Sequence, residues 1–559
     1  MIPAATPLRV MPIGDPRTAS RPSFERGLVG RRGTVRRDFG RRIARSVVVA
    51  LSIIGAATTT ASAQVTHLVP QTYDTIQAAI VAANNGDTVS VDAGVYLETI
   101  DFLGKAITVI APAGPASTTI DGAGVGPVVQ FVAGEGPGSI LSGFTVTGGS
   151  ALQGAGLSCV DSNPTLTGCW ILDNVLGGNV SLKNSPGPLT IEGCIIAGGT
   201  SSNFGGGILC DNVDLVLVDC TVSDNLSEQI GGGLSVNFSS PGAPPFNAIQ
   251  ITDCLFEGNV SYSFGGGVAI RSAELLAQGV VFRENAASIG GGGIALCCGA
   301  NGIVSDCRLI ENTGLAWGGG VLCDGAENFE WVRCLFAGNE SSISGGAVDT
   351  TVNGTNLAFD RCTFVANDSG SASALNLQFS STATITNSIV WDNVGGSFAG
   401  AATVSFSDVE YGYAGVAIIS VDPEFVDPVN GNYALAPTSP CIDAGDPASD
   451  PDPDGSVADL GAFAFSALPF IRGDANLDGR FDISDAVFSL FSLFLPGAPS
   501  FGCDDAADSN DDGIIDVSDG VYTLAALFVV GSAPPAPPYP GCGVDPTEDP
   551  LECLQTSCP

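Results

Sequence analysis

A short pattern of apolar and polar positions recurs along the middle of the chain. It reads Cys-x-apolar-x-x-Asn and is followed by a glycine cluster and a short apolar run. The first and third positions are apolar with a variable residue between them, which is the two-residue period of a β-strand. Nine copies start at positions 169, 194, 220, 254, 280, 307, 334, 362 and 388. The spacing is 25 to 28 residues, with one interval of 34, and such a period predicts a stacked solenoid.

Residues suited to chain corners flank each apolar segment. Glycine clusters such as Gly265-Gly266-Gly267 allow bends with positive φ. The asparagine at position six, as in Asn259, tolerates the left-handed conformation and hydrogen-bonds its neighbours. Strands stacked about 4.8 Å apart would align these asparagines in a ladder along a parallel β-helix. The stretch between Asp87 and Tyr411 holds roughly a dozen coils of this period.

The first 63 residues differ in composition from the rest. Arginines crowd positions 31–45, an apolar core follows over 46–57, and Ala61-Ser62-Ala63 is a small-residue cleavage site. We predict a signal peptide over residues 1–63, the alternative being an uncleaved membrane anchor. The mature protein would then be secreted or displayed at the cell surface, with no transmembrane segment. Arg36-Arg37 hints at twin-arginine export but leaves the export route open.

Removal of that segment leaves 9 basic and 55 acidic residues, a net charge of −46. This charge argues against a nucleic-acid partner. Acidic polysaccharides would also be repelled unless Ca²⁺ intervened. The simplest interpretation is a solvated acidic surface that keeps an exported protein in solution.

Seven of the 17 cysteines occupy the inward first position of a coil. Neighbours such as Cys307 and Cys334 would lie close enough to bridge, but free cysteine is also a good small core residue. We therefore predict a mainly reduced internal stack. A second series, for which pairing across the interior is an alternative, comprises Cys159, Cys210, Cys297 and Cys323. Two disulfides, with three connectivities open, are expected among Cys503, Cys542, Cys553 and Cys558.

The repeats resemble the right-handed parallel β-helix of the pectin-lyase-like superfamily over roughly residues 68–465, and their Phe-x-x-Asn and Gly-Gly-Ala/Ile signature also resembles autotransporter repeats. The stretch 73–87 resembles the short helix that caps the first coil in this family. A cap is needed because an open end exposes the core and unpaired strand edges. The stretch 422–463 resembles the tail of secreted and surface-anchored bacterial β-helix proteins, which implies export through the bacterial inner membrane. The expected fold is all-β, a single-stranded right-handed parallel β-helix over residues 64–466.

A second motif lies past Phe470. Two twelve-residue stretches place oxygen donors at positions 1, 3, 5, 9 and 12, glycine at 6 and a main-chain carbonyl at 7, the spacing that wraps one Ca²⁺. The first predicted ligand set is Asp474, Asn476, Asp478, Arg480 through its carbonyl, Asp482 and Asp485. The second is Asp508, Asn510, Asp512, Ile514 through its carbonyl, Asp516 and Asp519. A pair of acidic Asp-Gly turns without metal is the alternative.

An apolar helix is expected after each loop, at 486–494 and 521–528. With Asp at position 12, residues 467–530 resemble a type I dockerin, a small α-helical EF-hand-like domain, and residues 531–559 form a Pro- and Cys-rich tail. The resemblance implies about two Ca²⁺ and docking onto a cohesin-like protein. The segment 496–507 and the tail depart from compact dockerins, and Ile483-Ser484 and Val517-Ser518 match dockerin recognition pairs only in part. A cell-surface anchor or a calcium-stabilised end domain is the alternative.

Candidate catalytic residues are few. Polysaccharide-cleaving members of the superfamily use paired aspartates with His, Arg and Lys, or Ca²⁺ ligands with a basic residue. The only histidine here, His67, precedes the repeats. Asp219 and Asp253 precede position one of successive coils and could approach the roughly 5 Å separation of retaining glycosidases, and Arg333 could serve a lyase. Charged residues on a solenoid face are, however, usually just solvated.

Two functions of different classes follow. The favoured one is a secreted or surface-displayed noncatalytic β-helix that contacts polysaccharide or a cell surface and is attached through its calcium module. The alternative is a polysaccharide lyase or glycoside hydrolase that carries a dockerin-like appendage. A cleft beside the 237–248 insertion, which lengthens one coil to 34 residues, would favour the enzyme.

Overall fold

The computed structural model describes residues 64–237, 247–351, 354–436, 438–453, 455–465, 469–495 and 498–543, together with residues 551, 553, 556 and 558. The predicted signal peptide and most of the 237–248 insertion lie outside these residues. No helix among the described residues has the length and apolarity needed to cross a membrane.

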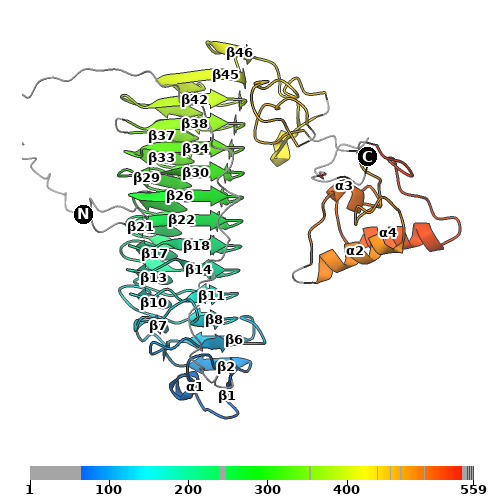
Figure 1. Cartoon of the computed structure of the whole chain (residues 1–559). Coiled ribbons are helices and arrows are strands. Elements are labelled where there is room, and N and C mark those ends of the chain that lie inside the picture. The colour runs from blue at the N-terminus through cyan, green and yellow to red at the C-terminus, as the bar shows by residue number, and fades with distance from the viewer. Residues whose placement is uncertain are drawn as a thin grey trace, which may run out of the picture. The chain divides into compact units, whose positions relative to one another are not determined.

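The repeats form a parallel β-solenoid whose strands stack coil upon coil (Figure 1). A 12-stranded sheet runs along it and gives about a dozen coils, so the predicted fold and coil number are confirmed. A 27-stranded sheet supplies two further columns of strands, and a seven-stranded sheet of two-residue strands lies at a corner. The named strands of successive coils pair in parallel, for example β18 (Leu215–Val218) with β22 (Asn247–Thr252).

The strand bounds follow the columns. The 12-stranded sheet contains β4 (Ile100–Asp101), β7 (Val129–Phe131), β10 (Leu157–Val160), β13 (Val180–Lys183), β17 (Ile208–Asp211), β21 (Leu234–Asn237), β25 (Val268–Arg271), β29 (Ile294–Cys297), β33 (Val321–Asp324), β37 (Val348–Thr350), β41 (Leu375–Leu377) and β44 (Phe398–Ala399). The seven-stranded sheet contains β16 (Thr200–Ser201), β20 (Leu226–Ser227), β24 (Val260–Ser261), β28 (Ala286–Ala287), β32 (Thr313–Gly314), β36 (Glu340–Ser341) and β40 (Asp368–Ser369).

The 27-stranded sheet has a first and a second column. The first contains β1 (Thr66–Val69), β2 (Thr88–Val91), β5 (Thr108–Ile110), β8 (Ile140–Ser142), β11 (Thr165–Thr167), β14 (Leu189–Glu192), β18, β22, β26 (Ala273–Gln278), β30 (Asn301–Ser305), β34 (Asn328–Val332), β38 (Asn356–Asp360), β42 (Thr382–Thr386), β45 (Ala401–Val409) and β46 (Gly415–Ile419). The second contains β3 (Gly94–Leu97), β6 (Thr118–Asp121), β9 (Thr145–Thr147), β12 (Trp170–Leu172), β15 (Ile195–Ala197), β19 (Thr221–Ser223), β23 (Leu255–Glu257), β27 (Val281–Arg283), β31 (Arg308–Ile310), β35 (Leu335–Ala337), β39 (Thr363–Val365) and β43 (Ile389–Trp391).

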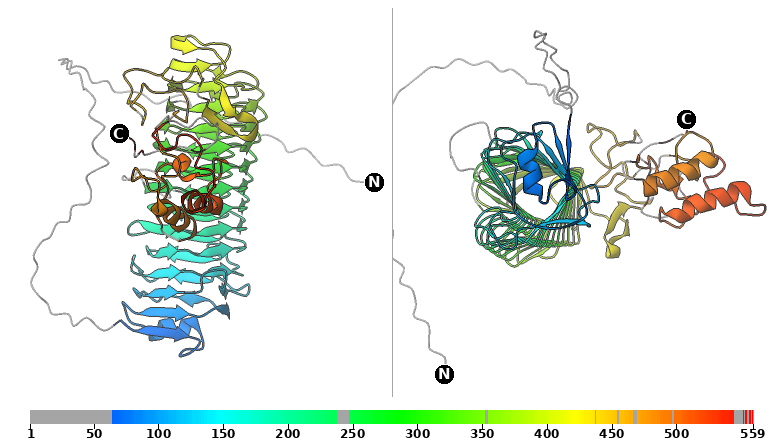
Figure 2. Two further views of the ribbon diagram at one scale, coloured as in Figure 1. Left: turned by 90° about the vertical axis from the view of Figure 1, so that its right-hand side faces the viewer. Right: turned by 90° about the horizontal axis from the view of Figure 1, so that it is seen from below.

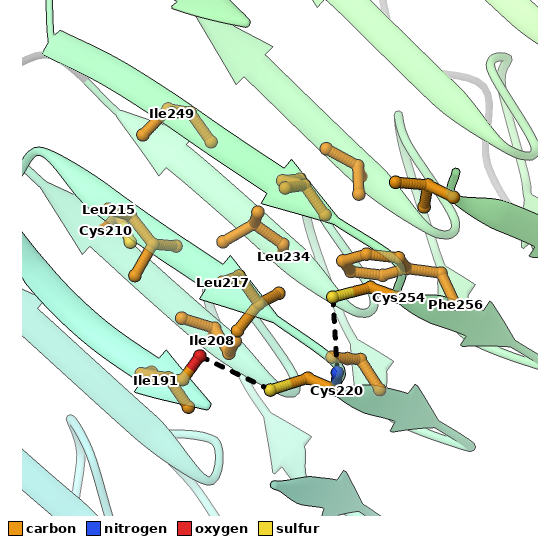
Figure 3. Packing of buried hydrophobic residues seen from close by; sticks show 14 of the residues in the cluster. Ile191, Ile208, Cys210, Leu215, Leu217, Cys220, Leu234, Ile249, Cys254 and Phe256 are labelled. Carbon is orange, nitrogen blue, oxygen red and sulfur yellow. Dashed lines mark hydrogen bonds between the residues drawn. The ribbon is translucent and has the colours of Figure 1, made fainter. Parts of the chain in front are cut away.

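Alternate residues of each strand point into the solenoid and form one continuous apolar core. Figure 3 shows this packing in the middle coils, where Leu215, Leu217 and Ile208 meet in the interior. Because coils are in register, equivalent side chains stack. The Phe336 and Phe364 rings lie 4.6 Å apart between centroids at an interplanar angle of 4°. Such stacking adds to the area-based gain from burying each ring.

The asparagines at position six form the predicted ladder. In each rung one Oδ1 accepts two hydrogen bonds from the preceding coil, as Asn312 Oδ1 does from the main-chain N–H and the Nδ2 of Asn285 at 3.1 and 3.0 Å. Its own Nδ2 donates to the carbonyl of Phe282 and to Asn339 Oδ1. These side chains are buried, so their polar groups must be paired inside the protein. The ladder therefore ties successive coils together.

One detail of the corner prediction was wrong. The asparagines of the ladder do not adopt positive φ; the residue at position five does, for example Asp224 at 54° and Glu284 at 55°. The main-chain N–H of the asparagine instead donates to the Oδ1 of the next rung. The left-handed residue therefore turns the chain immediately before the rung.

The ladder continues through the one coil that lacks its asparagine. Gly199 occupies position six there, and Asn179 from the preceding turn of chain takes over the rung. Its Oδ1 accepts from Asn174 Nδ2 at 2.9 Å, and its Nδ2 donates to Asn225 Oδ1 at 3.1 Å. A Cβ on Gly199 would lie 2.5 Å from Asn179 Nδ2, so the glycine makes room for the substitute.

The cysteines at position one form a second polar ladder on the inside of a corner. Cys254 Sγ accepts the Cys220 N–H at 3.3 Å, and Cys220 Sγ donates to Ile191 O at 3.5 Å (Figure 3). The Val218 carbonyl oxygen lies 3.1 Å from the same sulfur atom. Serine does the same farther along, where Ser388 Oγ accepts the Cys362 N–H at 3.0 Å. All cysteines of the coils are free thiols. The predicted reduced stack is therefore present, and pairing across the interior does not occur.

The first coil is closed by α1 (Ile76–Ala82), the expected cap helix, which lies across the end of the solenoid in Figure 2 (right). Ile76, Ala79 and Ile80 are buried against the coils. The Glu98 carboxylate accepts the N–H groups of the first turn at 2.9 and 3.0 Å. Lys105 Nζ donates to three carbonyls at the C-terminal end of the helix. Both helix ends are thus satisfied by side chains of the first coils.

Past the last coils, the stretch 422–465 packs on the outward face of the second column. It includes a small antiparallel pair, β47 (Phe425–Asp427) and β48 (Asn432–Leu435), joined by η1 (Pro428–Asn430). Its Phe425 and Ala462 cover outward side chains such as Leu335 and Val365. Arg361, at a coil corner, forms a buried ion pair with Asp452 at 3.3 Å.

Beyond residue 469 the chain forms a helical unit. Its helices are α2 (Ile483–Phe494), α3 (Asp504–Ala507) and α4 (Val517–Phe528). α2 and α4 begin within the last three positions of the two acidic loops, a few residues earlier than expected. Disulfides join Cys503 to Cys553 and Cys542 to Cys558, which selects one of the three connectivities left open by the sequence.

Replacing a rung of the asparagine ladder should destabilise the solenoid. Asn312→Ala leaves the Asn285 N–H and the Phe282 carbonyl buried without this partner, and we expect a loss of about 2 to 4 kcal/mol in the free energy of unfolding. Equilibrium denaturation of the mature chain, residues 64–559, measures this loss. Asn328→Ala, on the exposed surface, should change stability by no more than about 0.5 kcal/mol; equal losses in the two variants would contradict a structural role for the ladder.

Candidate functional site

Asp219 and Asp253, the candidate acidic pair, lie at the corner between the two columns of the 27-stranded sheet. Their φ angles are positive, 52° and 51°. Aspartate adopts this left-handed conformation more readily than most residues, so the corner by itself accounts for both. The structure places them on adjacent coils, where they line a shallow surface depression of about 410 Å³ together with Gly279.

Arg333 occupies the same corner but is not brought to that depression. The coils of Gly279 and Asp306 separate it from Asp253. Its guanidinium forms a bidentate ion pair with Asp306, with N–O distances of 2.6 and 2.9 Å. The hydrogen bond and the charge of Asp306 raise the pKa of Arg333. This pairing works against any role as a proton-abstracting base.

A second surface, which the sequence did not single out, follows the 12-stranded sheet. Just before each glycine cluster one residue bridges to its equivalent on the next coil. This outer row comprises Phe204, Ile230, Phe264, Gly290, Trp317 and Ser344. The large side chains in it are half-buried. They form a single file of apolar groups along the outside of the solenoid.

A polar row runs parallel to this apolar row. It consists of the last residues of strands β13 to β33, namely Lys183, Asp211, Asn237, Arg271, Cys297 and Asp324. Positive and negative side chains alternate irregularly along it. Lys183 Nζ, for example, donates to Gln153 Oε1 at 2.6 Å.

Two depressions lie between the rows and share Arg271. One, of about 320 Å³, is lined among others by Lys183, Phe204, Asp211 and Asn237. The other, of about 150 Å³, is lined among others by Ile230, Phe264, Cys297, Cys298 and Asp324. Gly290 interrupts the apolar row between Phe264 and Trp317, and a Cβ there would lie 2.9 Å from Leu322, which lines the second depression. We call these two depressions, with the rows beside them, the outer groove.

The first acidic loop wraps around two buried carboxylates. The oxygens of Asp474 accept the main-chain N–H groups of Asp478 and Gly479 at 3.0 and 2.9 Å. Those of Asp485 accept from Asn476 and Asp482 at 3.3 and 2.8 Å. Burial, together with the charges of Asp474 and Asp478, raises the pKa of Asp485 to about 7. Like charges are therefore crowded in a partly desolvated site.

The second loop repeats this geometry residue for residue. Asp508 accepts from Asp512 and Gly513 at 3.3 and 2.8 Å. Asp519 accepts from Asn510 and Asp516 at 3.3 and 2.9 Å. Burial, together with the charge of Asp508, raises the pKa of Asp519 to about 7. Each of the two loops thus encloses its own pair of carboxylates, at equivalent positions.

The donor set fits a hard cation such as Ca²⁺. Asp474, Asn476, Asp478 and Asp485, with the Arg480 carbonyl, offer the oxygen ligands in the first loop. The residues 34 places later offer the same set in the second loop, namely Asp508, Asn510, Asp512, Asp519 and the Ile514 carbonyl. Asp482 and Asp516 at position nine are engaged as helix N-caps, accepting the N–H groups of Ser484 and Ser518. In the described chain no three His, Cys, Asp or Glu side chains are already grouped as a metal site. Ligand closure would require side-chain adjustment.

Helices α2 and α4 leave matching apolar residues exposed. On α2 these are Ile483, Val487, Phe491 and Phe494. On α4 they are Val517, Val521 and Phe528, which stand 34 residues after Ile483, Val487 and Phe494. The spacing of three, four and seven residues places each set on one helix face. The unit therefore presents two equivalent apolar stripes.

Comparison with known proteins concerns the solenoid. No curated protein matches the chain. Among solved structures, pectate lyase Pel9A is 14% identical with a TM-score of 0.35, over 72% of this chain and 97% of that chain. The catalytic unit of a thermostable GH87 alpha-1,3-glucanase from Streptomyces thermodiastaticus strain HF3-3 is 13% identical with a TM-score of 0.36, over 62% of this chain and 65% of that chain. Likeness at this level is confined to the fold.

A family model described as "Right handed beta helix region" matches the chain twice, over residues 131–274 and 260–410. Together the two matches span 131–410, half of the chain, and they coincide with the coils that carry the asparagine ladder and the outer groove. The chain therefore belongs to the right-handed β-helix family.

Proposed function

We propose that this protein is a noncatalytic β-helix, secreted or displayed at the cell surface, that binds an extended neutral polysaccharide along its outer groove. The observation that carries the proposal is the pairing of an apolar row with a polar row along successive coils. Sugar rings have apolar C–H faces and hydroxyl edges. A surface that offers half-buried Phe204, Ile230 and Phe264 beside Asp211, Asn237 and Arg271 fits both.

The charge of the chain selects among polysaccharides. The mature chain, residues 64–559, carries a net charge of −46, which repels uronate-rich polymers at long range. Within the groove, Lys183 and Arg271 are interspersed with Asp211 and Asp324 rather than collected into a basic patch. Hydroxyl groups, which donate and accept, suit such mixed neighbours. A neutral glycan is therefore the ligand class we propose.

The corner residues support the noncatalytic part of the proposal. Arg333 is held by Asp306, and Arg361 is held by Asp452. Asp219 and Asp253 lie in a shallow, open depression, and their presence is accounted for by left-handed backbone. His67 is occupied at the first coil, where its Nε2 lies 3.1 Å from Asp87. None of these groups forms an acid–base pair within a cleft.

We further propose that the C-terminal unit is a dockerin-like module that binds two Ca²⁺ and attaches the β-helix to a cohesin-like protein or another surface anchor. Its support is the pair of loops that enclose Asp474 with Asp485 and Asp508 with Asp519. Bound Ca²⁺ would neutralise these crowded carboxylates and hold the loops against α2 and α4. The exposed stripes of α2 and α4 offer the apolar area that a protein partner would cover.

A second candidate function is polysaccharide cleavage. One observation favours it: Asp219 and Asp253 line the same depression on adjacent coils. Two carboxylates on one surface are the minimum for acid–base hydrolysis of a glycoside. The depression lies at a different corner from the outer groove, so substitutions at one site can be used to test one function without altering the other.

Substitutions in the outer groove should weaken glycan binding. We expect Phe264→Ala and Arg271→Ala each to reduce affinity at least about tenfold, or ~1.4 kcal/mol, for the neutral polysaccharide that a binding screen identifies. Affinity electrophoresis and calorimetry of the mature chain measure this. Tyr411→Ala, an exposed aromatic outside the groove, is the matched control and should bind as the unmodified protein does.

The same preparations distinguish the two candidate functions. Incubation with the bound polysaccharide should release no reducing ends and no unsaturated products. Product formation that Asp219→Asn or Asp253→Asn abolishes, while Phe264→Ala leaves it intact, would replace the binding function by an enzymatic one.

Calorimetric titration of the mature chain with Ca²⁺ should show two sites. Asp474→Ala and Asp508→Ala should each remove one site, because each deletes the carboxylate around which its loop turns, and the double variant should bind none. Asp74→Ala, an exposed aspartate near the first coil, should retain both. Heat uptake that is unchanged in the double variant would place the ions elsewhere and remove the module's assignment.

A further inference from the structure

Two adjacent cysteines, Cys297 and Cys298, lie at the end of β29 in the wall of the outer groove. Their Sγ atoms are 2.9 Å apart. Cys297 is half-buried and Cys298 is exposed, whereas every other free cysteine in the described residues is buried. The ladder that occupies the cysteines of position one does not include this pair. The thiols of this pair are therefore accessible to dissolved oxidants, whereas the interior thiols are not.

The backbone holds the two sulfur atoms on the surface. The Cys297 carbonyl accepts the N–H groups of Ser272 and Ala300 at 3.2 and 3.1 Å. The Cys298 N–H donates to the Asp324 carbonyl at 3.3 Å, and its φ is 62°. The dipeptide is thus pinned to the coil on either side. The two sulfur atoms, 2.9 Å apart, need to approach by only about 0.9 Å to reach the length of a disulfide bond.

Arg271 lies beside the pair on the preceding coil, where it is the strand partner of Cys297. Burial by itself would lower the pKa of Arg271, but the neighbouring Cys297 and Cys298 outweigh it, and the pKa is raised. The thiolate is the reactive form of cysteine in disulfide exchange, and a neighbouring guanidinium favours it. Burial, followed by the hydrogen bond and charge of Cys298, raises the pKa of Cys297 to about 12, so the exposed Cys298 is the thiol that attacks first. Asp324, the partner of Cys297 on the following coil, lies on the opposite side.

We propose that Cys297 and Cys298 are a redox-active vicinal dithiol, which closes to a reversible disulfide by exchange with a small-molecule disulfide such as oxidised glutathione. The exposed Cys298 thiolate attacks one sulfur of the oxidant, forming a mixed disulfide and releasing one thiol. Cys297 then attacks Cys298 Sγ, forming the Cys297–Cys298 bond and releasing the second thiol. Each cysteine loses its proton, the pair gives up two electrons, and the oxidant is reduced to two thiols.

Covalent geometry makes this disulfide labile. Neighbouring Cα atoms across a trans peptide are about 3.8 Å apart, below the roughly 4.4 Å at which ordinary disulfides begin. A ring closed at that separation is strained and therefore more readily reduced than a relaxed disulfide. The pair thus acts as a reversible site, in contrast to the Cys542–Cys558 disulfide, whose Cα atoms lie 5.8 Å apart. Closure also withdraws the thiolate that faces Arg271, which changes the electrostatics of the outer groove.

The test uses the mature chain after mild reduction, the probe being oxidised glutathione, followed by alkylation of the native protein and peptide mass spectrometry. We expect the peptide that holds Cys297 and Cys298 to lose two hydrogen atoms, to carry no glutathione and to resist alkylation. A small dithiol should restore both thiols while the Cys542–Cys558 disulfide stays intact. Cys307, in the buried ladder, should remain unmodified and serves as the internal control.

Single variants separate the two steps. Cys297→Ser should stop the reaction at a stable glutathione adduct on Cys298, and Cys298→Ser should yield at most about a tenth of that adduct, since the attacking thiol is gone. A stable adduct on Cys298 in the unmodified sequence, a Cys298-linked dimer, or no change at either residue would each overturn the proposal. The result does not depend on glycan binding, so the two proposals fail separately.

Discussion

The buried asparagine ladder is the constraint on which the rest of the solenoid depends. A polar side chain in an apolar interior is tolerated only when all its groups are paired. Asn312 is paired only if Asn285 and Asn339 lie one coil before and one coil after it in register. A shift of one residue in any coil would break two rungs and turn the apolar side chains outward. Register, period and core are therefore fixed together.

This constraint explains where the chain varies. The coil that contains the 34-residue interval keeps its pairings on both sides, because β21 and β22 each remain in register with their neighbours. Extra length is accepted only between strands. In the same way, Asn179 replaces a missing rung from another position in the chain, provided that Gly199 leaves it space. The requirement is for a paired amide at that point, whichever residue brings it.

The same backbone also restricts which residue types occur at positions on the outside, so their occurrence alone does not indicate a function. Asp219, Asp253, Asp306, Arg333 and Arg361 recur at one corner because the chain turns there through a left-handed residue. The aspartates suit that conformation, and the arginines obtain their partners from Asp306 and Asp452. A regular row of charged residues along a solenoid can therefore result from the backbone conformation of the corner and is not by itself evidence of a catalytic site. The outer groove differs because its rows are not required by the turn.

The sequence predicted features that repeat locally. The solenoid, the cap helix, the asparagine ladder and the helices after the acidic loops all follow from periods and spacings within about thirty residues. It misplaced the left-handed corner by one residue, since Asn suits that conformation as well as the Asp224 that adopts it. It did not reveal the outer groove, because the residues of its two rows stand one per coil and become neighbours only when the coils stack.

Cysteine content shows most clearly why environment decides chemistry in this fold. Ser388 and Ser407 replace cysteine in the position-one ladder and make the same bonds, so that position needs a small side chain that donates and accepts. A thiol there is satisfied by the carbonyl two residues earlier and by the N–H of the preceding coil, as Cys220 is through Val218 and Cys194. Seventeen cysteines therefore do not imply a disulfide framework along the coils. Cys298 lies outside the position-one ladder and is exposed, so its thiol is accessible to reagents at the surface.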